Sequence, residues 1–138
     1  MPAARRIGHP DLGYVGSKKL LRYNHRFVVG ATSAVSSQDA AKDSGVSAAP
    51  TPTETGRFTL TFSGGQKHRT FRGGSVTLIG PDDAAYGAVS VGLHSIFRDN
   101  DLAVDGTLEL QFLNASTNFT DAHLPTGTVV IVDLVMEV

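Results

Sequence analysis

Alternation of apolar and polar residues is the strongest pattern in the chain, and it is concentrated in the C-terminal part. Residues 57–62 (RFTLTF) and 107–113 (TLELQFL) alternate with a period of two, which is typical of strands with one buried face. Residues 128–138 (TVVIVDLVMEV) are apolar on both faces and predict a central strand. Two further segments, 75–80 and 88–97, also predict strands. The predicted core consists of Phe58, Leu60, Phe62, Leu108, Leu110 and Phe112, with Val130, Val132 and Leu134 packed nearby.

The segments between these strands favour antiparallel pairing. They are polar and rich in glycine, and none carries a long apolar stripe with helical period. Parallel strands would need helices as crossover connections. Residues 56–138 are therefore predicted to form an antiparallel β-sandwich or small barrel, and the fold class is all-β. A β-domain of this size buries a limited fraction of its surface, so association with other chains would stabilise it.

The first 55 residues show weaker periodicity. Residues 17–23 (SKKLLRY) predict a possible helical turn, and residues 27–30 (FVVG) a short strand. Residues 31–55 are dominated by Ser, Thr, Ala and Pro, which is typical of linkers and extended arms. The chain is thus divided into a long, basic N-terminal arm (1–30), a linker (31–55) and the β-domain (56–138).

Charge is distributed unevenly along the chain, although the formal net charge is only -1. Six of the 12 basic residues lie within the first 26 positions, against one acidic residue there, Asp11. From Asp99 onward there are seven acidic residues and no Lys or Arg. Such a chain is suited to contact copies of itself or an acidic neighbour.

Composition excludes several classes of protein. The chain has no cysteine, which rules out disulfides and thiolate metal sites. No segment has the roughly 18 consecutive apolar residues that span a bilayer. The residues after Arg6 lack the apolar core of a signal peptide, so synthesis in the cytoplasm is expected.

The acidic segment RDNDLAVDG invites comparison with a calcium-binding loop. Counting from Asp99, however, an EF-hand would need Gly where Val104 stands and Glu where Leu110 stands. A polar turn between strands is the favoured interpretation, and metal binding at RDND stays an open question.

No catalytic constellation emerges from the remaining motifs. Neither a G-x-S-x-G nucleophile elbow nor a phosphate-binding glycine motif occurs, and the glycine pairs at 64–65 and 73–74 fit hairpin turns. The histidines are scattered without metal-ligand spacing on one element. The five histidines are His9, His25, His68, His94 and His123. The chain is therefore predicted not to be an enzyme and to need no cofactor.

Nucleic-acid binding is disfavoured by the overall charge. A second basic cluster at Lys67, Arg69 and Arg72 could join the basic arm in contacting phosphates. The sequence pI of about 6.5 is nevertheless low for a dedicated nucleic-acid binder.

The layout of the chain resembles that of small virion proteins of tailed bacteriophages. The features that carry the resemblance are the basic head RRIGHPDLGYVG, the Ser/Thr/Ala/Pro arm, the segment GRFTLTFSGGQKHRTFRGGSVTLIGPDD and the closing GTVVIVDLVMEV. Small phage head proteins have a similar rhythm at the start and the end of their β-domain. The resemblance spans residues 56–138 and is one of rhythm, without a diagnostic motif.

The resemblance implies a non-enzymatic decoration, or cement, protein on the outer surface of the capsid. The implied partners are the major capsid protein and neighbouring copies of the chain, in a homo-oligomer for which a trimer is favoured. No membrane and no nucleic acid is implied. The basic head would then be an anchoring arm whose cations pair with acidic groups of neighbours and whose aromatic residues are buried in the contact. The candidate partner-binding residues are Arg5, Arg6, Tyr14, Lys18, Lys19, Arg22, Tyr23, Arg26 and Phe27.

Two other interpretations remain open. A tail or neck component of the virion would show a similar layout. A carbohydrate-binding adhesin module is a different class that often uses a β-sandwich. The absence of Trp and the presence of only three Tyr leave little aromatic surface for stacking on sugars.

Overall fold

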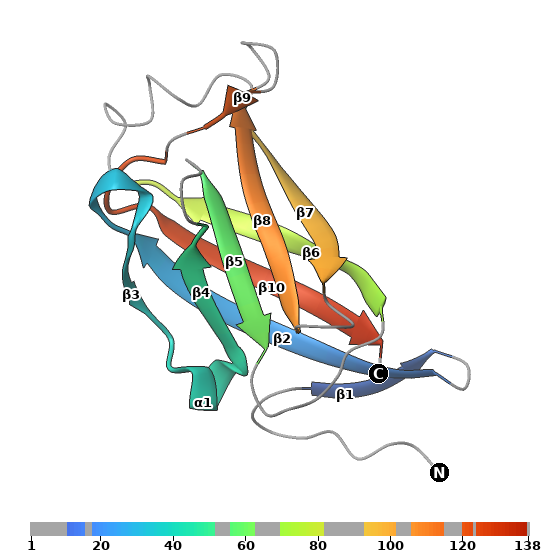
Figure 1. Cartoon of the computed structure of the whole chain (residues 1–138). Coiled ribbons are helices and arrows are strands. Elements are labelled where there is room, and N and C mark those ends of the chain that lie inside the picture. Colours follow the sequence, from blue (N-terminus) through green and yellow to red (C-terminus); the bar gives the residue numbers. More distant parts are fainter. Residues whose placement is uncertain are drawn as a thin grey trace.

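The structure, a computed structural model, is an antiparallel β-sandwich (Figure 1). It describes residues 11–15, 18–51, 56–62, 70–81, 93–101, 106–114, 120–122 and 124–137, for a few of which only the backbone is described. The strands within these ranges form two sheets that are not closed into a barrel. The predicted all-β sandwich is therefore confirmed.

The first sheet, sheet A, has the order β1-β2-β10-β6, and β3 also pairs with β2. β1 pairs with the first part of β2 and β3 with its last part, so both lie along the edge of β2 that faces away from β10. β10 lies between β2 and β6, which confirms that residues 128–138 contain a central strand. The strands are β1 (Asp11–Val15), β2 (Lys18–Val29), β3 (Val35–Gln38), β6 (Thr70–Ile79) and β10 (Val129–Glu137).

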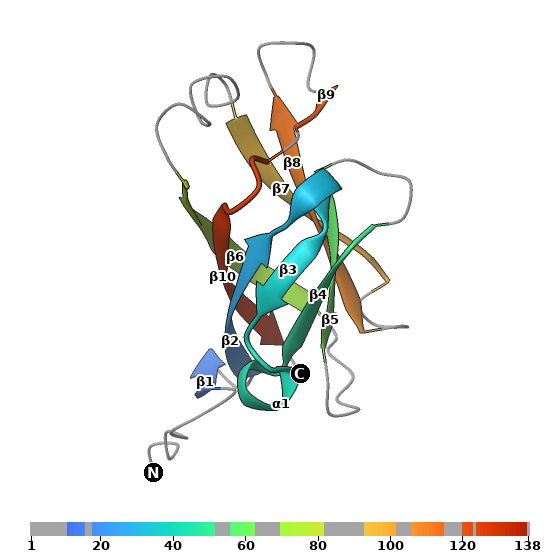
Figure 2. The same ribbon diagram turned by 90° about the vertical axis from the view of Figure 1, so that its left-hand side faces the viewer.

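The second sheet, sheet B, has the order β4-β5-β8-β7, and the short β9 pairs with the end of β8. Its strands are β4 (Val46–Pro50), β5 (Arg57–Phe62), β7 (Leu93–Asp101), β8 (Thr107–Asn114) and β9 (Thr120–Asp121). Two short helical segments, η1 (Ala31–Ser33) and α1 (Ala41–Ser44), lie between strands β2 and β4. When the molecule is turned by 90°, β3, α1 and β4 lie together along one margin of the sandwich (Figure 2).

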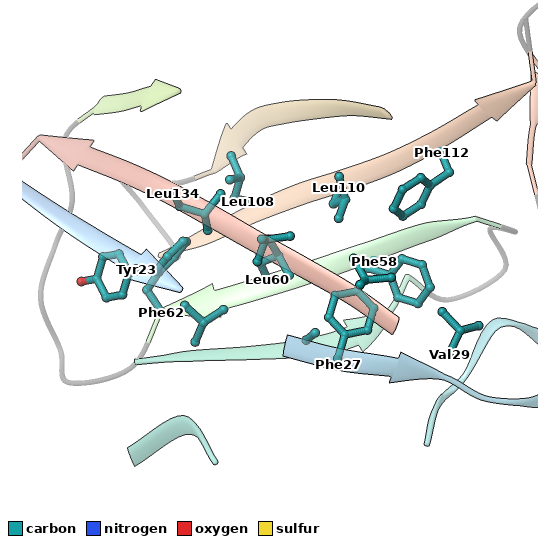
Figure 3. Close-up of a cluster of buried hydrophobic side chains, with 14 of the residues drawn as sticks. Tyr23, Phe27, Val29, Phe58, Leu60, Phe62, Leu108, Leu110, Phe112 and Leu134 are labelled. Atoms are coloured by element: carbon teal, nitrogen blue, oxygen red, sulfur yellow. The ribbon is translucent and has the colours of Figure 1, made fainter. Parts of the chain in front are cut away.

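The core fills the space between the two sheets (Figure 3). Every residue of the predicted core is buried, from Phe58 and Phe112 at 0% exposure to Phe62 at 7%. Phe27 of sheet A packs on Phe58 of sheet B with ring centroids 5.0 Å apart, and Phe58 in turn lies 6.1 Å from Phe112. Side chains that alternate along a strand can pack in this way because successive residues point to opposite faces.

Residues 18–50 belong to the sandwich, which corrects their assignment to a basic arm and a linker. The expected helical turn at residues 17–23 is replaced by β2, whose inner face carries Leu21, Tyr23, His25, Phe27 and Val29. The period-two alternation is present in β2, but His and Tyr on the buried face obscure it. β4 lies in the predicted linker and still contributes to the core, because its small side chains fit close to β5.

The chain reverses between β3 and β4 through α1. Gly45 follows this helix with a φ of 76°, a left-handed conformation in which glycine avoids the steric cost of a Cβ atom. A Cβ atom at Gly45 would lie 2.8 Å from Cε1 of Tyr23. The turn therefore presses closely on the core, and a side chain at this position would separate α1 from β2.

Candidate binding surface on the outer face of sheet A

The predicted partner-binding residues of β2 point to opposite faces of sheet A. Tyr23 and Phe27 point into the core and are only 3% and 0% exposed, which corrects their expected role as anchors in a partner. Arg22 and Arg26 lie on the opposite face of the same strand and are exposed. Lys19 is also exposed, near the start of the strand.

The remaining predicted residues are not placed as side chains. Arg5 and Arg6 lie outside the described residues. Tyr14 is in β1 and Lys18 begins β2, but only their backbones are described. The structure therefore brings Arg22 and Arg26 together on one surface, and the roles of Arg5, Arg6 and Lys18 stay predictions.

The register of sheet A defines what surrounds these two arginines. Arg26 lies directly across from Ile131 of β10, and Arg22 lies across from Val135. The row next to Arg26 is fully aliphatic, with Val28, Val129 and Ile79 side by side on β2, β10 and β6. This outer face of sheet A therefore combines partly exposed aliphatic side chains on β10 with arginines on the neighbouring strand.

A polar pair divides the aliphatic residues of β10. Asn24 donates a hydrogen bond of 2.6 Å from Nδ2 to Oδ1 of Asp133, its direct neighbour across the sheet. At the end of the strand, Nη1 of Arg72 lies 3.5 Å from Oε2 of Glu137. Exposed ion pairs of this kind contribute about 0–1 kcal/mol.

Two further acidic residues lie next to the arginines of β2: Asp11 of β1 is directly across from Arg22, and Oδ2 of Asp39 accepts a hydrogen bond from the backbone amide of Arg26. The side chains of Arg22 and Arg26 are exposed, so both can reach a partner.

Aliphatic side chains with arginines beside them suit a protein surface as partner. Interface cores are apolar and are enriched in Arg relative to other charged residues. Half-buried aliphatic side chains on β10 can lose their remaining contact with water when a second surface covers them. The guanidinium groups can form two parallel hydrogen bonds to a carboxylate at the border of the contact.

A buried polar network lies at the margin of the sandwich formed by β3, α1 and β4, and it was not predicted from the sequence. His25 is 0% exposed and Ser44 is 1% exposed. Nδ1 of His25 lies 2.7 Å from Oγ of Ser44, and Nε2 lies 2.9 Å from Oε1 of Gln38. The network joins β2, β3 and α1.

Backbone contacts fix the donors and acceptors of this network. Nε2 of Gln38 donates to the carbonyl of Ala48, and Oε1 of Gln38 accepts from the amide of Ala48. Because Oε1 is an acceptor only, Nε2 of His25 must carry the proton that it donates to Gln38.

The hydroxyl of Ser44 has one proton and three acceptors within reach: Nδ1 of neutral His25 at 2.7 Å and the carbonyls of Val46 and Ala40 at 3.0 and 3.4 Å. The shortest contact assigns this proton to Nδ1 of His25, and the hydroxyl oxygen accepts from the amide of Val46.

Burial alters the ionisation of both titratable groups on the inner face of β2. Desolvation lowers the pKa of His25, and the hydrogen bond to Gln38 and the nearby charge of Asp39 only partly oppose it. Desolvation raises the pKa of Tyr23 to about 12. Although Ser44 and His25 are in contact, both are too deeply buried to meet a substrate, so this pair has the role of a structural bridge.

The structure shows no metal site among the residues it describes, and it changes the interpretation of the RDND segment. Within the described part of the chain, no three His, Cys, Asp or Glu side chains are grouped so that they could hold a metal ion. Residues 98–101 (RDND) continue β7, where a turn was expected, and the side chains of its two aspartates are not described. On the outer face of sheet B, Arg57 and Glu109 approach to 3.9 Å. In the described ranges, no helix is long and apolar enough to cross a membrane.

Comparison with known proteins adds no relative. No protein-family model matches the chain, and neither the curated proteins nor the solved structures contain a match.

Proposed function

We propose that the chain is a non-enzymatic structural virion protein that decorates the head shell of a tailed bacteriophage. The virion context comes from the sequence resemblance over residues 56–138. The observation that carries the binding role is the outer face of sheet A, where Arg22 and Arg26 flank aliphatic residues of β10. The partners are the major capsid protein and neighbouring copies, and the protein resides on the capsid surface.

Charge and apolar area give this face two separable contributions to binding. An arginine that stays at the border of a contact is worth about 0–1 kcal/mol and weakens with salt. An arginine that is buried against a carboxylate costs about 2–5 kcal/mol when it is truncated. Repetition over many sites of a shell increases the effect of small differences at each site.

The test is binding to particles that were assembled without the protein. Purified wild-type protein and an Arg26→Glu variant are mixed with such particles, and occupancy is measured by co-sedimentation across a salt series. We expect Arg26→Glu to lower occupancy at low salt. Lys42→Glu is the matched control, because Lys42 is exposed on α1, away from the outer face of sheet A, and the charge change is the same.

Four results would contradict the proposal. The protein could be absent from purified particles when their proteins are analysed by mass spectrometry. It could bind tails and not heads, which would favour the tail or neck interpretation. Equal occupancy of wild type and Arg26→Glu would show that the outer face of sheet A does not contribute to binding the particle. Binding to a sugar array, with none to particles, would favour an adhesin.

A further inference from the structure

β6 forms an open edge of sheet A. It pairs with β10 and, within the described ranges, with no other strand. A register shift at Val135/Met136 and the positive φ of Gly73 interrupt the first part of β6. The rest of the strand, residues 74–79, pairs with β10 without a further register shift.

The hydrogen-bonding direction of each residue in this edge follows from the sheet register. The amide of Val29 donates to the carbonyl of Thr128, so the even-numbered residues of β10 point their backbone groups toward β2. The odd-numbered residues of β10 therefore bond to β6, where they lie across from Ser75 and Thr77. The backbone groups that point away from the sheet are those of Gly74, Val76 and Leu78.

The side chains along this edge lack the usual protection against strand pairing. Natural edges often carry Lys, Pro or inward-pointing charges, which prevent association with another strand. Residues 73–81 (GGSVTLIGP) contain no charged residue, and the Pro lies beyond the strand. Ile79 is 51% exposed, and Thr77 is exposed. The charged residue of β6, Arg72, lies before the irregular position at Gly73 and is paired with Glu137. At the edge of sheet B, β7 carries Arg98 within its paired part, and β4 is flanked by β3.

We propose that β6 pairs with β6 of a second copy of this chain, in antiparallel orientation about a two-fold axis at Thr77. Two copies can form hydrogen bonds only in registers that bring their outward-pointing backbone groups together. In the register centred on Thr77, Val76 of each copy lies across from Leu78 of the other. The inner face then continues with apolar side chains. On the outer face Thr77 meets Thr77 of the second copy, a favourable cross-strand pair. No like charges meet anywhere along the contact.

This pairing goes beyond the proposed function, because it would hold for a free protein in any context. A two-fold contact closes on itself and produces a dimer, which differs from the trimer that the resemblance implies. Failure of the pairing would leave binding through Arg22 and Arg26 unaffected, since these residues are on β2.

Cysteine cross-linking tests the register directly. The chain has no cysteine, so a single Thr77→Cys variant introduces the only thiol. Opposed residues of a non-hydrogen-bonded pair lie about 4.5 Å apart between Cα atoms, within the range of a disulfide. We expect Thr77→Cys to form a disulfide-linked dimer under mild oxidation. Thr61→Cys, at an exposed position of β5 in the other sheet, is the matched control and is expected to stay largely unlinked.

Charge variants test the pairing without a covalent bond. Thr77→Lys places two like charges at the axis, and we expect the dissociation constant of the dimer to rise by about fivefold. Thr77→Glu should act in the same way, and an equimolar mixture of the two variants should restore the dimer, as measured by sedimentation equilibrium. Thr61→Lys should leave the dissociation constant unchanged.

Several outcomes would overturn the proposal. One is a monomer at every concentration tested, together with no more cross-linking of Thr77→Cys than of Thr61→Cys. Another is a dimer or trimer that Thr77→Lys does not weaken. Preferential cross-linking of Ser75→Cys over Thr77→Cys would reject the register that is centred on Thr77.

Discussion

The two margins of the sandwich are built on opposite principles. The closed margin consists of β3, α1 and β4, which connect the two sheets, and the buried contacts of His25 with Ser44 and Gln38 join these elements. The open margin consists of β6 and β7, the outer strands of sheets A and B. There the sheets meet through Phe71 and Phe97, whose ring centroids lie 5.1 Å apart and which are only partly buried.

The difference shows how a small sandwich can be stable and still offer a surface for assembly. Buried hydrogen bonds are costly to leave unmade, so a satisfied network specifies one arrangement of the closed margin. Apolar contacts at the open margin are less specific, and among the described residues no strand pairs with the outer edge of β6. Stability is therefore expected to be concentrated at the closed margin and association at the open one.

The largest expected effect compares one phenylalanine at each margin. Phe27→Ala should lower the free energy of unfolding by about 3–5 kcal/mol, since Phe27 is fully buried against Phe58. Phe71→Ala at the open margin should cost about 1–2 kcal/mol, because its ring already contacts water and a truncation leaves a smaller cavity. Urea denaturation of both variants measures the difference. Equal losses would show that the two margins are packed alike.

The central part of the fold was predictable because its alternation is uninterrupted. In β5 and β8 each inward position is a large apolar residue and most outward positions are polar, so the periodicity identifies both strand and face. β2 has the same geometry, but His25 on its inner face and basic residues on its outer face resemble a charged arm. A buried histidine is recognisable only once its partners are known, and these lie 13 and 19 residues away in sequence.

The candidate binding surface was predictable in part, for a related reason. Composition drew attention to Arg22 and Arg26, and both are exposed on one face of sheet A. Composition cannot distinguish an exposed anchor from a core residue, so Tyr23 and Phe27 were assigned to the same contact although the alternation of β2 buries them. The aliphatic neighbours come from β10 and β6, and only the sheet register brings them next to β2.

A smaller effect is expected when the polar network of the closed margin is broken. Ser44→Ala removes the hydroxyl that donates to Nδ1 of His25 and accepts from the amide of Val46. Leaving these buried groups without partners should cost about 1–3 kcal/mol in the free energy of unfolding. Ser47→Ala is the matched control on β4, at a half-buried position, and should change stability by less than about 0.5 kcal/mol. Similar losses in both variants, measured by thermal unfolding, would show that the network contributes little.

The smallest effect is a pH dependence of stability that comes from the buried histidine of the closed margin. Desolvation lowers the pKa of His25 in the folded state, so below its ordinary value of about 6.5 the unfolded chain binds a proton that the folded chain does not. The free energy of unfolding should therefore fall as pH drops from neutrality through this range, until the folded protein is also protonated. Denaturation series at several pH values measure this slope. His25→Gln should flatten it. Persistence of the full slope in His25→Gln would show that protons are not linked to stability through the closed margin.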